Sequence, residues 1–64
     1  MKNRLRAIRE EKGISQEELS EKSGVSRTTI SELETEKKEV TTNITLEKIA
    51  KALGEKVSNI FFVN

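Results

Sequence analysis

The sequence predicts an all-α fold of five short helices. Apolar residues recur at spacings of three and four, the period at which side chains return to one face of an α-helix. Each of the three glycines follows such a segment, at Gly13, Gly24 and Gly54, where a left-handed backbone can end a helix. The one segment whose composition also suits a strand is 61–64. These observations predict helices packed around one small core.

The first two helices are expected over residues 2–12 and 16–23. In the second, Ser15 and Glu18 form the pattern of a capping box, in which each side chain reaches the backbone N–H of the other residue. Ile14, just before this box, is placed to pack back onto the helix that follows. The residues expected on the inner stripe of the first helix are Met1, Leu5, Ile8 and Lys12.

The remaining helices are expected from Ser26 to about Glu34, from a cap at Asn43 or Thr45 to Gly54, and over 57–61. Ser26 is a favourable N-cap because its hydroxyl can accept a hydrogen bond from the backbone. The apolar positions expected to face the core from the last two helices are Leu46, Ile49, Ala50, Leu53, Val57, Ile60 and Phe61.

Composition excludes several classes of function. The chain has 64 residues with no Cys and no His, so it lacks disulfides, thiol nucleophiles, the usual zinc ligands and the commonest general base. All acidic residues are Glu, and none stands in a catalytic or metal-binding set. No apolar run approaches the roughly 20 residues that span a bilayer. A soluble, cytoplasmic, non-enzymatic protein without a cofactor or metal is expected.

Residues 16–34 have the pattern of two short helices joined by a tight turn at Gly24. Ser20 is small enough to let the two helices of this motif cross at close range, and Val25 can fill the space between them. This is the pattern of a helix-turn-helix, which predicts DNA binding.

These residues resemble the phage-repressor/Cro-type (Xre-type) helix-turn-helix family over nearly the whole chain. The resemblance implies a lambda-repressor-like DNA-binding fold, with residues 1–64 as a single domain. Two features depart from the family: Ser20 stands where Ala is usual, and 35–44 replaces an Asn-Gly turn and a shorter basic loop. The marks that carry the resemblance are Gln16, Ser20, Gly24, Val25, Ile30, Leu33, Glu34 and the segment 45–54.

The expected recognition helix, Ser26–Glu34, would enter the major groove. With Ile30 and Leu33 facing inward, a 100° step per residue places polar side chains on the opposite face. Arg27 flanks that face at the end that this motif brings closest to the bases. The candidates for base contact are Arg27, Thr28, Ser31 and Glu32. For Glu32, an exposed carboxylate or a partner of a nearby cation is the other interpretation.

The resemblance also implies contacts to the DNA backbone. Gln16 would hold a phosphate with its amide and the N-terminus of its helix. Arg9 is expected to pair with Glu34, fixing the third helix against the first, and in addition to face a phosphate. The weaker phosphate candidates are Thr29 and Lys38.

The charge distribution indicates modest affinity for DNA. The formal net charge is +1, and residues 13–36, which hold the motif, carry six acidic and two basic side chains. Residues 1–12 carry five basic and two acidic side chains, and residues 37–64 carry five and three. Since phosphate neutralisation dominates affinity for DNA, binding should depend on helix N-termini and a few well-placed donors.

The expected partner is double-stranded DNA, bound by a homodimer on an inverted-repeat operator, with no small-molecule site. Neighbouring Phe61 and Phe62 cannot both face one small core, so Phe62 and Val63 are the expected dimer interface. A tail folded loosely onto its own domain is the other interpretation of Phe62. An antitoxin-like protein or a protein-interaction module of the same fold is the alternative function.

Overall fold

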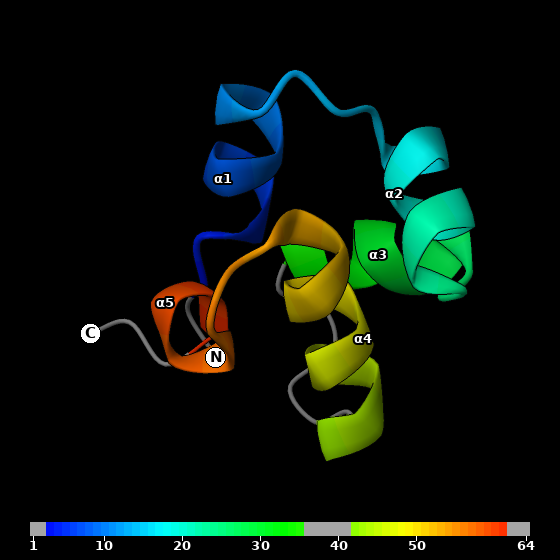
Figure 1. The fold of residues 1–64 in the computed structure, drawn as a ribbon. Helices are drawn as coiled ribbons and strands as arrows, with labels where there is room; N and C mark the ends of the chain where they lie inside the picture. The colour runs from blue at the N-terminus through cyan, green and yellow to red at the C-terminus, as the bar shows by residue number, and fades with distance from the viewer. Residues whose placement is uncertain (1–2, 36–41, 62–64) are drawn as a thin grey trace.

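The computed structural model describes residues 3–35 and 42–61, which form five α-helices and contain no strand (Figure 1). The two helices of the motif lie beside α4 on one side, and α5 packs on its other side with α1 above it (Figure 1). The all-α prediction is therefore confirmed. The helices are α1 Leu5–Glu11, α2 Gln16–Ser23, α3 Arg27–Glu34, α4 Asn43–Leu53 and α5 Val57–Phe61.

The predicted caps of α2 and α3 are confirmed. The N–H of Glu18 donates to the Ser15 hydroxyl at 3.0 Å, and the N–H of Ser15 donates to the Glu18 carboxylate at 3.4 Å. The N–H of Thr29 donates to the Ser26 hydroxyl at 3.2 Å. Gly24 ends α2 with φ +74°, a conformation that a residue with a Cβ rarely adopts. Local sequence thus sets the starts of both helices of the motif and the end of the first.

The first helix begins later than the sequence suggests, at Leu5 instead of residue 2. Asn3 accepts the N–H of Leu5 at 3.0 Å and donates its side-chain amide to the carbonyl of Leu33 at 2.9 Å. The N–H of Arg4 donates to the carbonyl of Ile60 at 2.7 Å. These two residues are held by α3 and α5, and so they do not continue α1 toward the N-terminus.

Two further expectations about helix ends are wrong. Thr42, not Asn43 or Thr45, caps α4, because its backbone is extended and its hydroxyl accepts the N–H of Thr45 at 3.2 Å. Lys12 is exposed beyond the end of α1 instead of lying on its buried stripe, and its ammonium pairs with Glu55 at 3.4 Å. Hydrogen bonding from Asn59 and from Lys12 lowers the pKa of the Glu55 carboxyl.

The core joins all five helices and contains the predicted apolar residues of α4 and α5. Ile60 and Phe61 have no exposed surface, while Val57 and Ile14 pack against the core from its edge. Val25 is buried in the motif turn, where its N–H donates to the hydroxyl of Ser23 at 3.1 Å. The buried apolar residues are Leu5, Ile8, Leu19, Val25, Ile30, Leu33, Leu46, Ile49, Ala50, Leu53, Ile60 and Phe61.

Candidate nucleic-acid interface

A shallow groove runs between the start of α2 and the outer side of α3. Because Ile30 and Leu33 are fixed in the core, the opposite side of α3 is turned outward. The groove is lined by Gln16, Arg27, Thr28, Ser31 and Glu32, and we call it the α2–α3 groove. The structure thus brings together all four residues predicted to contact bases and the main residue predicted to contact phosphate.

The side chains of the α2–α3 groove differ in how far they are exposed. Arg27 and Thr28, in the first turn of α3, are exposed, whereas Ser31 and Glu32 are partly buried. Glu32 is thus only partly exposed, which differs from the exposed carboxylate given as one alternative to base contact. The exposed donors of the groove therefore stand at the N-terminal end of α3.

Arg9 and Glu34 form the ion pair that the resemblance implies. Nε and Nη2 of Arg9 donate to the two carboxylate oxygens of Glu34 at 2.7 and 3.2 Å, while Nη1 donates to the carbonyl of Ile14 at 2.8 Å. The side chains are only 11% and 3% exposed. The hydrogen bond to Glu34 raises the pKa of the Arg9 guanidinium. Little of Arg9 is left accessible, so its contact with a phosphate stays a prediction.

Glu34 has a third partner that the sequence did not reveal. The side-chain amide nitrogen of Gln16 donates to Glu34 Oε1 at 3.1 Å. The carboxylate of Glu34 therefore joins the end of α1, the start of α2 and the end of α3. No local signal predicts this bond, because the two residues are 18 positions apart and meet only through the crossing of α2 and α3.

Asn3 is a second residue that the sequence reasoning missed. Its side-chain oxygen accepts the N–H of Leu5, the first residue of α1, and its side-chain amide donates to the Leu33 carbonyl near the end of α3, 30 positions away. The bond from Asn3 to α3 cannot be read from the sequence, because it depends on where α3 lies relative to the start of α1. Together with the Arg9–Glu34 pair, Asn3 fixes the C-terminal end of α3 and so the angle at which α3 faces outward.

The other predicted phosphate contacts have different positions. Thr29 is partly buried and receives a hydrogen bond from the Ser26 hydroxyl at 2.8 Å, outside the α2–α3 groove. Lys38 lies outside the described residues, as do Phe62 and Val63 of the predicted dimer interface.

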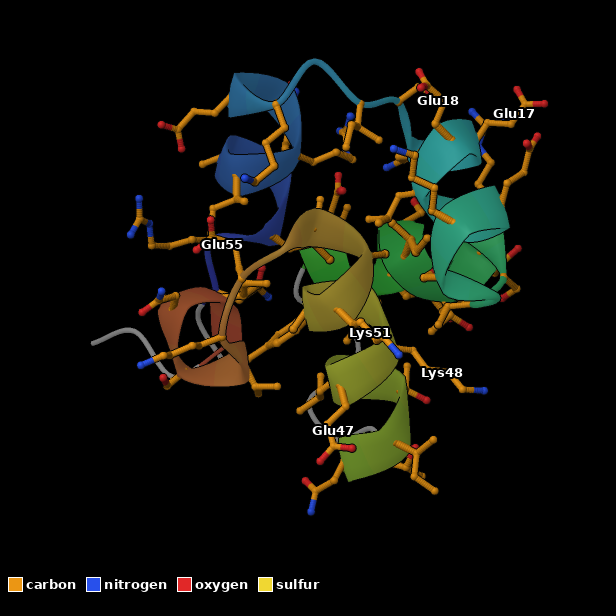
Figure 2. The ribbon with its side chains drawn as sticks, in the orientation of Figure 1. Glu17, Glu18, Glu47, Lys48, Lys51 and Glu55 are labelled. Carbon is orange, nitrogen blue, oxygen red and sulfur yellow. The ribbon has the colours of Figure 1, made fainter. Side chains whose placement is uncertain are left out.

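Exposed charges surround the site unevenly. Glu17 and Glu18 extend outward from the first turn of α2, whereas Lys48 and Lys51 extend from α4 (Figure 2). Carboxylates at a helix N-terminus stabilise the helix, but near the α2–α3 groove they also repel a polyanion. Within 3–35 and 42–61, no helix is long and apolar enough to cross a membrane, and no cluster of side chains suited to a metal ion occurs.

Comparison with known proteins agrees with this geometry. A sequence profile described as helix-turn-helix matches residues 5–60, a range that includes nearly all of the five helices. No curated protein matches the chain. The match covers the capped α2, the turn at Gly24 and the outward-facing α3. The chain therefore belongs to the Cro/Xre-type helix-turn-helix family, and it is a DNA-binding domain of lambda-repressor-like fold.

Proposed function

We propose that the protein is a cytoplasmic transcriptional repressor that reads a specific operator in double-stranded DNA with α3 in the major groove. The α2–α3 groove carries this proposal, because its polar side chains converge on one accessible strip of the surface. DNA binding follows from the family. Sequence specificity and repression are our inference, supported by the exposed donors at the start of α3.

Arg27 is the main base-reading residue of this proposal. It is exposed in the first turn of α3, where the helix dipole makes a cation slightly unfavourable. A guanidinium at this place can donate two hydrogen bonds to O6 and N7 of guanine. Thr28 can contact a thymine methyl group, Ser31 can donate to a base, and Glu32 can accept from the N4 amino group of cytosine.

Gln16 is the main phosphate-binding residue. It is the first residue of α2, so that its amide and the unpaired N–H groups of the helix start can act on one anion. Arg9, Thr29 and Lys38 are assigned weaker contacts to the backbone. With so few cations near the groove, these contacts position the domain but supply modest affinity.

Two variants separate these roles. Arg27→Ala is expected to cost about 1–3 kcal/mol on the best operator and to relax the preference at one base pair, since a base-specific contact is lost. Gln16→Ala should weaken binding to all sequences alike. The measurement is the affinity of each variant for the operator, selected from a random oligonucleotide pool, and for random duplex DNA at several salt concentrations.

Equal losses on operator and random DNA for Arg27→Ala would contradict its base-reading role. If wild-type protein forms no specific complex in any selected duplex, the fold serves instead as a protein-interaction module or in an antitoxin-like protein. The salt series separates the two kinds of contact. Phosphate contacts weaken as the salt concentration rises, and they weaken for all sequences alike. The ratio of operator affinity to random-DNA affinity, measured at one salt concentration, therefore reports the base contacts.

We also propose that the domain acts as a homodimer on an inverted repeat. One module of this size makes few contacts, and joining two half-sites roughly adds their binding free energies. Phe61 fills the core, so the adjacent Phe62, with Val63, is the apolar surface assigned to the partner copy.

Phe62→Ser is therefore expected to weaken dimerisation and operator binding together, because it removes apolar area from the contact. Sedimentation of the variant and the wild type at tens of micromolar, with circular dichroism as a check on helicity, measures the effect. If both proteins are monomers, or both are equally dimeric, Phe62 is not at the interface.

A further inference from the structure

We propose that Glu34 is a positioning residue for DNA binding: it orients the side-chain amide of Gln16 so that an N–H, and not the carbonyl oxygen, faces the phosphate. This inference rests on the proposed function, which assigns Gln16 to a phosphate. It adds a role for a carboxylate that is 3% exposed and that lies behind the binding surface.

The orientation of the amide follows from the chemistry of its partner. An ionised carboxylate only accepts hydrogen bonds, so the side of the Gln16 amide that faces Glu34 must be its NH₂ group. The opposite orientation would place the amide oxygen against a carboxylate oxygen, with two acceptors facing each other. One N–H of this amide binds Glu34. No hydrogen bond among the described residues uses the other, which is therefore the donor left for an anion.

Glu34 can hold the amide firmly because it is itself held. Its two oxygens accept two hydrogen bonds from the Arg9 guanidinium, at 2.7 and 3.2 Å. Arg9 in turn donates to the carbonyl of Ile14, two residues before Gln16. The guanidinium also compensates the charge of Glu34, which reduces the repulsion between this carboxylate and a phosphate bound on the other side of the amide.

The expected gain is preorganisation. A free glutamine side chain has many rotamers, and it loses them when it binds a ligand. In this protein, the bond to Glu34 restricts them before DNA arrives. The gain applies to every DNA sequence, since a phosphate contact carries no base information.

A double-mutant cycle tests the proposal. Gln16→Met removes the amide but keeps the length of the side chain, and Glu34→Gln keeps the shape of Glu34 while allowing either orientation of the Gln16 amide. We expect Glu34→Gln to weaken binding to random duplex DNA about three- to tenfold when Gln16 is present. In the Gln16→Met background, the same change should have little effect. Thermal melts identify the temperature at which all four proteins are folded, and binding is measured there.

Glu17→Gln is the matched control, because it removes the same charge from an exposed neighbour of Gln16. It should alter binding by the same factor in both backgrounds. A second measurement needs no DNA: the side-chain amide protons of Gln16 in ¹H–¹⁵N NMR spectra should have well-separated shifts in the wild type. In Glu34→Gln these shifts should move together, whereas in Glu17→Gln they should not change.

The outcomes are distinguishable. If Glu34→Gln weakens binding equally in both backgrounds, Glu34 acts only through the placement of α3, and the positioning role is overturned while the phosphate role of Gln16 stands. If Gln16→Met leaves binding unchanged, the phosphate role in the proposed function fails, and the positioning role fails with it. Gln16 amide shifts that are the same in Glu34→Gln and the wild type also overturn the positioning role.

Discussion

Glu34→Ala is expected to destabilise the fold by about 3–5 kcal/mol, the usual cost of removing one partner from a buried ion pair. The variant leaves the guanidinium of Arg9, whose side chain is only 11% exposed, without its carboxylate, and it also removes the bond from Gln16. For a domain of 64 residues, this loss approaches the whole free energy of unfolding. Urea unfolding followed by circular dichroism measures the change.

Two comparisons make this result specific. Glu21→Ala removes an exposed carboxylate from α2 and should change the free energy of unfolding by less than about 0.5 kcal/mol. The double replacement Arg9→Met, Glu34→Leu should recover most of the stability, because no buried charge is then left unpaired. If Glu34→Ala is no less stable than Glu21→Ala, the ion pair does not hold α3 in place.

Phe61→Ala is the second large effect, with an expected loss of about 3–5 kcal/mol. Phe61 is the last residue of α5, and its side chain is fully buried among the other helices. Its removal leaves a cavity that a small and closely packed core cannot refill. Thermal and urea unfolding of the variant, followed by circular dichroism, measure the loss.

Ile44→Ala is the matched control for Phe61→Ala. Ile44 is 64% exposed on α4, so that it contributes little to the core. Its replacement should lower the free energy of unfolding by much less than 1 kcal/mol. If the two variants unfold at the same urea concentration, α5 does not close the core as its burial indicates.

Features set by neighbouring residues were predictable from the sequence. The capping box at Ser15 and Glu18, the cap at Ser26 and the turn at Gly24 each depend on residues within four positions of one another. They fix α2 and α3, and with them the face that forms the α2–α3 groove. The start of α4 was harder to predict from the sequence. Thr42, Asn43 and Thr45 are all acceptable caps, and only the backbone conformation of each residue decides among them.

Features set by distant residues were not predictable from spacing. The side-chain amide of Asn3, just before α1, donates to the carbonyl of Leu33, and that of Gln16 donates to Glu34. Both bonds form because of where α3 crosses the other helices. The Arg9–Glu34 pair was expected only because the family resemblance implied it. The apolar period predicts which residues of each helix face the core. The angle between two helices, however, follows from the packing of their side chains.

The meeting of three helix ends at Glu34 has a consequence for local opening of the molecule. Fraying of the end of α1, the start of α2 or the end of α3 breaks a hydrogen bond that also holds one of the other two. We therefore expect these three ends to open as one cooperative unit, at a free energy closer to that of global unfolding. The first turn of α4, which bears the exposed Ile44, does not share these bonds. Partial unfolding should begin there, and we expect the α2–α3 groove to stay intact while it does.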